Sequence, residues 1–143
     1  MSDFRRIAEN VFVSPQISVA DIAAARELGV TLVINNRPEG EEPGQTPGAE
    51  IEAATRAAGM DYVAIPITMP TLAQSHVTAM ADAFAAASGP VLAYCRSGTR
   101  STFLWALAQA KGGMDPEGIV RAAAAAGYDL SPIRAALDAL AAR

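Results

Sequence analysis

Apolar and polar residues occur in blocks along the chain, and these blocks predict an alternation of strands and helices. Runs rich in Val, Ile and Leu, typical of buried strands, lie at residues 30–34, 61–67 and 91–94, and an extended segment at 10–17 precedes them. Each run is bounded by Gly, Pro or Asn, which favour turns. The pattern therefore predicts four extended segments, three of them buried.

Helices are predicted between and after these segments. The first begins at Ser18, with Asp21 at the position of a capping-box acid, and ends at Gly29. Further alanine-rich stretches, which favour helix, cover residues 49–58, 73–87, the segment from about 101 to 110, 116–126 and 132–142. The segment from Pro38 to Gly48, rich in Pro, Gly and Glu, is predicted to be a long surface loop.

Strands that alternate with helices predict an α/β fold, with a mostly parallel central sheet flanked by helices, and residues 1–143 are expected to form a single domain. In such sheets the ligand lies beyond the carboxyl ends of the strands. This rule predicts that residues 35–37, 67–70 and 95–100 meet at one rim.

Composition narrows the classes of function. The net charge of -4 argues against a nucleic-acid partner, and no apolar run approaches the length that crosses a membrane. The single cysteine excludes an intrachain disulfide and, with no signal-like N-terminus, predicts a cytoplasmic protein. The one histidine, His76, has no ligand-type residue at metal spacing, so neither a metal nor another cofactor is expected. The oligomeric state stays open.

The segment around Cys95 carries the chemistry. A short apolar strand delivers the cysteine to the rim, and a helix follows at once. Backbone N–H groups at a helix start, together with nearby arginines, favour a thiolate, which is the reactive form. We therefore expect Cys95 and Arg100 to be catalytic. The rest of the anion-binding loop is predicted to be Arg96, Ser97, Gly98, Thr99 and Ser101. Gly98 would let the loop curl, and Ser101 would cap the helix or donate to the sulfur.

Other interpretations of these residues have to be considered. A lone cysteine is usually a small buried apolar residue, but two neighbouring arginines argue against that here. Arg37 is either an anion-binding residue or part of a turn before Pro38. The acidic residues Glu39, Glu41 and Glu42 are interpreted as a solvated loop and not as a metal site.

Two resemblances refine this prediction. The segment from Tyr94 to Ser101 resembles the active-site loop of single-domain rhodaneses, with a Cys-x4-Arg pattern. Residues 30–39 and the Gly/Pro loop after them resemble the bacterial phosphatase-like domain of beta-lactamase-hydrolase-like proteins, also called a sulfur transferase family. That resemblance covers about residues 6–110. It implies a fold like that of tyrosine and dual-specificity phosphatases.

The two resemblances imply different reactions. Phosphatases of this fold use Cys-x5-Arg, and Ser101 occupies the position where that arginine would stand, while Arg100 comes one residue early. A smaller ring favours a persulfide sulfur over a phosphoryl group. Phosphatases also use an aspartate on a neighbouring loop, but residues 65–71 contain no acid. Sulfur transfer needs less proton delivery, because thiolates are good leaving groups.

The expected function is therefore sulfur transfer through a Cys95 persulfide. The donor would be thiosulfate or glutathione persulfide, and an external thiol would accept the sulfur. A cysteine-dependent phosphatase is the alternative, and a carboxylate that reaches the pocket would favour it. A non-catalytic anion-binding module and a redox sensor remain further alternatives.

Overall fold

Five short strands form one central sheet in the computed structural model, which describes residues 2–142. The strands follow the order β1-β2-β5-β3-β4 across the sheet. β1 is antiparallel to β2, and all other neighbours are parallel. The predicted mostly parallel sheet is confirmed. The strands are β1 (Arg5–Ala8), β2 (Val11–Ser14), β3 (Leu32–Asn35), β4 (Asp61–Ala64) and β5 (Val91–Tyr94).

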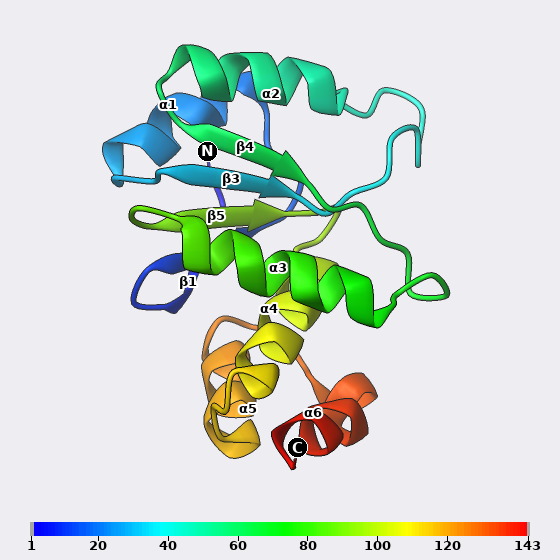
Figure 1. Cartoon of the computed structure of the whole chain (residues 1–143). Coiled ribbons are helices and arrows are strands. Elements are labelled where there is room, and N and C mark those ends of the chain that lie inside the picture. Colours follow the sequence, from blue (N-terminus) through cyan, green and yellow to red (C-terminus); the bar gives the residue numbers. More distant parts are fainter. Residues whose placement is uncertain (1, 143) are drawn as a thin grey trace.

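Helices cover both faces of the sheet (Figure 1). α1 and α2 pack together on one face, α3 and α4 lie on the other, and α5 and α6 pack against the outer side of α4. The helices are α1 (Val19–Glu27), α2 (Gly48–Ala57), α3 (Gln74–Ala86), α4 (Thr99–Lys111), α5 (Pro116–Ala125) and α6 (Arg134–Ala141), and a 3-10 turn (Ser131–Ile133) precedes α6. Each predicted helix is present within a few residues of its expected bounds.

Alternation along the strands divides the core into two parts. In β3, Val33 packs with Leu92 against the α1–α2 side, while the next residue, Ile34, packs with Ala93 against α3 and α4. Successive side chains of a strand point to opposite faces, so a strand buried on both faces is apolar throughout. This explains why the central strands read as continuous apolar runs.

The sequence pattern missed strand β1. Its four residues include Arg5 and Arg6, and charged residues weaken the apolar alternation that reveals a strand. Both arginines lie over aromatic rings, Arg5 at 5.1 Å from the centre of Tyr128 and Arg6 at 5.2 Å from the centre of Phe12. Charged side chains are also common on edge strands, because they hinder pairing with other chains.

Two other expectations concern element ends. The capping box at the start of α1 is confirmed: the Ser18 N–H donates to Asp21 Oδ2 at 2.8 Å, and the Asp21 N–H donates to Ser18 Oγ at 3.3 Å. The strand expected at 61–67 ends earlier, at Ala64, although the Ile65 N–H still donates to the Asn35 carbonyl.

Within residues 2–142, no helix has both the length and the apolar character needed to cross a bilayer.

Candidate active site

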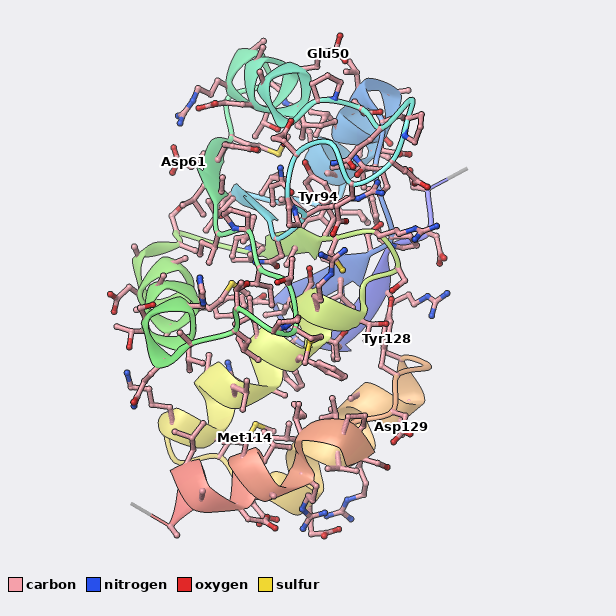
Figure 2. The ribbon with its side chains drawn as sticks, turned by 90° about the vertical axis from the view of Figure 1, so that its right-hand side faces the viewer. Glu50, Asp61, Tyr94, Met114, Tyr128 and Asp129 are labelled. Atoms are coloured by element: carbon pink, nitrogen blue, oxygen red, sulfur yellow. The ribbon has the colours of Figure 1, made fainter. Side chains whose placement is uncertain are left out.

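The carboxyl ends of β3, β4 and β5 form one rim, as the sequence predicted. The Asn36 N–H donates to the Tyr94 carbonyl at 2.8 Å, and the Ile67 N–H donates to the Asn36 carbonyl at 3.1 Å. These bonds align the three segments that follow the strands. Cys95, the residue after β5, therefore lies beside the residues that leave β3. Figure 2 faces this rim.

The loop after Cys95 curls around the sulfur. Gly98 adopts a left-handed conformation with φ of 92°, and its N–H donates to Cys95 Sγ at 3.1 Å. α4 begins at the next residue, and the Thr102 hydroxyl donates to the Gly98 carbonyl at 2.8 Å. The sulfur thus accepts a backbone N–H at the amino end of a helix. Both the N–H and the helix dipole direct partial positive charge at the sulfur.

Cys95 has no exposed surface, yet its surroundings are not those of an inert buried thiol. The Gly98 N–H donates to Sγ, and Arg100 follows two residues later at the start of α4. The pKa of Arg100 is raised, chiefly by its hydrogen bonds to Glu41. Because the side chain is fully covered, part of this cover has to move before a substrate reaches Sγ.

Arg100 connects three segments of the rim. From the first turn of α4, its Nη1 donates to the Ile67 carbonyl at 2.9 Å and to Glu41 Oε2 at 2.7 Å, while Nη2 donates to Glu41 Oε1 at 2.8 Å. This is a two-point pairing between guanidinium and carboxylate, the strongest geometry for such a pair. Glu41 is thus the anionic partner of Arg100, and the catalytic role of Arg100 stays a prediction.

Glu41 is held by a second arginine as well. Arg37 Nε donates to Glu41 Oε1 at 2.9 Å. The hydrogen bonds from Arg100 and Arg37 lower the pKa of Glu41 to about 2, against the opposing effect of burial. Glu41 is therefore a carboxylate anion at neutral pH. Glu41 lies in an exposed loop, as the sequence predicted, but its carboxylate is paired with two arginines, which the sequence alone did not reveal.

Arg37 forms the turn that the sequence offered as one interpretation, and its role in binding an external anion stays a prediction. Its N–H donates to Asn35 Oδ1 at 2.9 Å, which forms the turn, and its guanidinium is almost fully buried, with 2% of its surface exposed. That guanidinium donates to Glu42 Oε1 at 2.9 Å and to Gln16 Oε1 at 3.0 Å, in addition to Glu41. Arg37 therefore anchors the loop between β3 and α2.

The other two acidic residues of that loop also have partners. Glu39 accepts the Gly48 N–H at 2.9 Å, so it caps the start of α2. Glu42 pairs with Arg37 and, at 3.4 Å, with Arg96. Arg96 keeps 66% of its side chain exposed and is directed to the loop surface. The structure thus pairs Arg100 with Glu41 and leaves Arg96 exposed beside Glu42.

Ser101 does not have either of its two predicted contacts. Its hydroxyl donates to Asn36 Oδ1 at 2.8 Å, and Gly98 holds the N-cap position of α4. Asn36 in turn donates to the Ile65 carbonyl at 3.0 Å. The prediction that Ser101 caps the helix or donates to Sγ is therefore corrected: this buried pair ties α4 to the segment after β3.

The remaining two loop residues lie nearer the surface than Gly98. The Ser97 hydroxyl donates to Thr99 Oγ1 at 2.9 Å, and the Thr99 N–H points to Ser97 Oγ at 3.4 Å. Ser97 is exposed and Thr99 is half-buried. Both belong to the loop that surrounds the sulfur, as predicted, and their hydroxyl groups bond to each other in this structure.

The sequence pattern missed one further contact at the loop. Tyr128, which follows α5, donates its hydroxyl to the Ser97 carbonyl at 3.1 Å (Figure 2). Burial raises the pKa of Tyr128 above its ordinary value. The tyrosine thus stays protonated and able to donate at neutral pH. A tyrosine between two alanine-rich helices carries no sequence signal that would place it at an active site.

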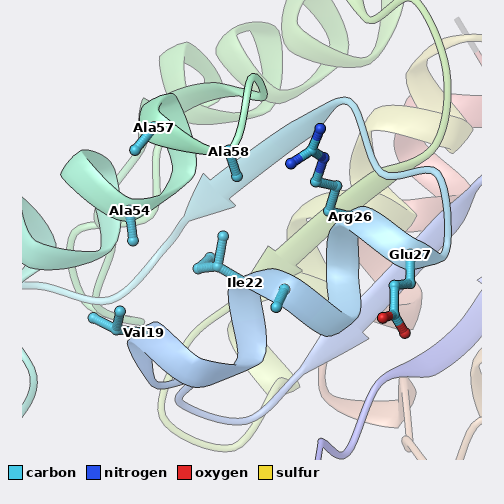
Figure 3. A pocket seen from close by; sticks show the side chains of 8 residues that line it. Val19, Ile22, Arg26, Glu27, Ala54, Ala57 and Ala58 are labelled. Carbon is cyan, nitrogen blue, oxygen red and sulfur yellow. The ribbon is translucent and has the colours of Figure 1, made fainter.

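A hollow of about 670 Å³ lies between α1 and α2, away from Cys95 (Figure 3). Aliphatic side chains such as Val19 and Ile22 line it, together with alanines of α2, and Arg26 and Glu27 are its charged residues.

Comparison with known proteins identifies the family. Residues 3–112 match the family model described as the phosphatase-like domain of beta-lactamase hydrolase-like protein. This chain belongs to that family. The resemblance seen over about residues 6–110 is thereby confirmed, while the likeness of the Cys95 loop to rhodaneses stays a prediction. The beta-lactamase hydrolase-like protein of Agrobacterium fabrum is 40% identical over 108 residues, 76% of this chain and 25% of the relative.

A second relative, from Xylella fastidiosa, is 35% identical over 126 residues, which are 87% of this chain and 29% of the relative. The chain thus spans between a quarter and a third of the length of these relatives. Both are named beta-lactamase hydrolase-like proteins.

Solved structures show the same fold. A candidate phosphatase from Neisseria meningitidis is 34% identical, with a TM-score of 0.86 over 98% of this chain and 99% of that one. A second, from Shewanella putrefaciens, is 22% identical, with a TM-score of 0.78 over 99% and 93% of the two chains. TpbA of P. aeruginosa is 18% identical, with a TM-score of 0.69 over 99% and 89%. Together they confirm the predicted phosphatase-like fold.

Proposed function

We propose that this domain is a sulfurtransferase that carries sulfane sulfur as a persulfide on Cys95. The observation that carries the proposal is the short interval between Cys95 and Arg100. With four residues between them, the loop closes around one sulfur atom, which accepts the Gly98 N–H at 3.1 Å. A loop of this size suits a terminal sulfur better than a phosphoryl group with three equatorial oxygens.

The reaction has two half-reactions. The Cys95 thiolate attacks the outer sulfur of thiosulfate, the sulfur–sulfur bond of the donor breaks, and sulfite leaves with the bonding electrons. The Cys95 persulfide that results is an anion, which the Gly98 N–H and Arg100 stabilise. An external thiolate, such as that of glutathione, then takes the terminal sulfur and restores the Cys95 thiolate. With one cysteine in the chain, the acceptor has to be a second molecule.

Neither half-reaction requires a proton donor for the leaving group, because sulfite and thiolates leave as anions. The segment between β4 and α3 agrees with this, because it offers no acidic side chain that could donate a proton to a leaving group. Ile67 contributes its backbone carbonyl to Arg100, and residues 65–71 carry no carboxylate. The tyrosine before Cys95, Tyr94, is buried, and burial raises its pKa far above neutral, so it does not act as a base.

Phosphate-ester hydrolysis is the second candidate, and two observations favour it. The family is described as phosphatase-like, and the structures from Neisseria meningitidis and Shewanella putrefaciens are described as phosphatases, so the comparisons support this candidate better than sulfur transfer. A carboxylate, that of Glu41, also reaches the pocket. In the present arrangement Glu41 is ionised and paired with two arginines, so it holds no proton for a leaving alcohol.

Intact-mass measurement separates the two candidates. After incubation with thiosulfate, and separately with glutathione persulfide, the wild-type chain should gain the mass of one sulfur atom, and Cys95→Ala should gain none. In parallel, hydrolysis of an aryl phosphate is followed for wild type and Cys95→Ser. Cysteine-dependent phosphate release without a gain of sulfur would establish the second candidate and reject the first.

A pair of arginine variants tests the site assignment. Arg100→Gln should slow sulfur loading, because it removes the cation beside the sulfur. Arg96→Gln makes the same charge change on an exposed side chain that pairs with Glu42, and it should load at nearly the wild-type rate. Equal effects of the two variants would contradict the role of Arg100.

A further inference from the structure

We propose that the carboxylate of Glu41 fills the subsite that binds the anionic group of the substrate, so that a substrate enters by displacing it. This inference rests on the proposed reaction at Cys95 for the identity of that substrate. Its first support is geometric. Three N–H donors from two arginines converge on the Glu41 carboxylate, at 2.7, 2.8 and 2.9 Å.

The same donors match the group that a substrate would bring. A guanidinium binds carboxylate, sulfonate and phosphate oxygens in the same two-point geometry. Glu41 therefore stands in the structure for an external oxyanion held between Arg100 and Arg37. Arg100 lies in the first turn of α4, two residues after Gly98, whose N–H donates to Cys95 Sγ, so the subsite adjoins the loop that holds the sulfur.

The loop that carries Glu41 is built so that this contact can be exchanged. The loop runs between β3 and α2 and includes Gly40 and Gly44, both with positive φ. Bonds within the loop, from Gln45 to the Pro38 carbonyl and from the Glu41 N–H to Gln45, maintain its shape independently of Arg100. Release of the Glu41 carboxylate from Arg100 thus leaves these bonds unaffected.

The contact between Glu41 and Arg100 affects which sulfur donors can react, because Cys95 is fully buried. Cys95 has no exposed surface, and a donor with a group that competes with Glu41 for Arg100 gains an anchor beside the loop that holds the sulfur. Small donors with an oxyanion, such as the sulfonate of thiosulfate or the carboxylate of a persulfidated peptide thiol, have that group. A neutral reagent lacks it and depends on spontaneous opening of the loop.

Alkylation of Cys95 tests the inference without any sulfur transfer. Iodoacetate and iodoacetamide react with the thiolate in the same way, with loss of iodide, but only iodoacetate carries a carboxylate. The measured quantity is the ratio of their rate constants, followed by intact mass. We expect Glu41→Gln to raise this ratio by about tenfold or more, because the vacated arginines attract the anionic reagent.

Two controls fix the interpretation. Glu52→Gln makes the same charge change on an exposed side chain that pairs with Arg56 and with neither arginine of the subsite, so it should leave the ratio near the wild-type value. Adding Arg100→Gln to Glu41→Gln should abolish the gain. An unchanged ratio in Glu41→Gln, or an equal rise in Glu52→Gln, would overturn the inference. Both results are independent of whether Cys95 carries sulfur, so they do not depend on the outcome of the mass experiment.

Discussion

The hydroxyl of Tyr128 donates to the carbonyl of Ser97 at 3.1 Å and so links the C-terminal helices to the loop that surrounds Cys95. Its ring is also the surface on which the Arg5 guanidinium lies. The segment that follows α5 thereby touches both the first strand and the active-site loop. This contact joins the segment after α5 to the loop that follows Cys95.

Replacing Tyr128 by Phe should remove the hydrogen bond and keep the packing of the ring. We expect a loss of about 1 kcal/mol in the free energy of unfolding and slower sulfur loading of Cys95, because the Ser97 carbonyl loses its donor. Urea denaturation and intact-mass time courses measure the two effects. Tyr62→Phe is the matched control, since Tyr62 bonds to Asn35 away from the loop. If both variants load at the same rate, Tyr128 does not position the loop.

A side chain added at Gly98 should disturb the loop for two reasons. Its φ of 92° is unfavourable for any side chain, and a Cβ there would collide with the hydroxyl of Tyr128. Gly113 has a similar φ of 99°, but an added Cβ meets no described atom within 4 Å.

We therefore expect Gly113→Ala to cost about 1–2 kcal/mol in unfolding free energy, the backbone strain alone. Gly98→Ala should cost more and should also slow alkylation of Cys95, because the N–H that faces the sulfur shifts. Denaturation and alkylation of both variants measure this difference. Equal costs, with unchanged alkylation, would show that the Tyr128 contact has no effect.

Replacing Ser101 by Ala should act on stability more than on chemistry. The substitution leaves the buried Asn36 Oδ1 without its hydrogen-bond donor, which costs about 1–3 kcal/mol. The alkylation rate of Cys95 should change little, because Ser101 does not contact the sulfur. Ser97→Ala, at an exposed position, is the stability control. A large fall in alkylation rate with unchanged stability would instead support donation from Ser101 to Sγ.

The central elements were predictable because local patterns determine them. A few neighbouring residues are enough to predict each of them. This holds for the apolar runs of β3 and β5, the capping box at Ser18 and the small residues after Cys95. The rim was predictable for the same reason, since parallel strands place their carboxyl ends together. These features needed no knowledge of distant contacts.

The partners of the site were not predictable, because they depend on long-range contacts. Glu41 meets Arg100 across 59 residues and Tyr128 meets Ser97 across 31, and neither spacing leaves a periodic signal. An acidic residue among Gly and Pro has the same local appearance whether it is solvated or paired. The choice between sulfur and phosphoryl transfer depends on the chemistry of Cys95, which the fold of the family leaves open.

The pairing of Glu41 with Arg100 and Arg37 predicts a pH-dependent contribution to stability. The pKa of Glu41 is about 2 in the folded chain, against an ordinary value of 4.5. The contribution is therefore fully present above about pH 4.5 and is lost as the pH falls toward 2. It amounts to at most about 3 kcal/mol, reduced by the 24% of the side chain that stays exposed to solvent.

Urea denaturation of wild type and Glu41→Gln at pH 6, 4 and 3 separates the contribution of Glu41 to the free energy of unfolding from the contributions of the other carboxylates. The wild type should be the more stable chain at pH 6, and the difference should shrink as the pH falls, because protonated Glu41 resembles glutamine in charge. Glu52→Gln, on an exposed pair with Arg56, should show little difference at any of these values. A difference that stayed constant from pH 6 to pH 3 would show that Glu41 does not owe its stabilising effect to its charge.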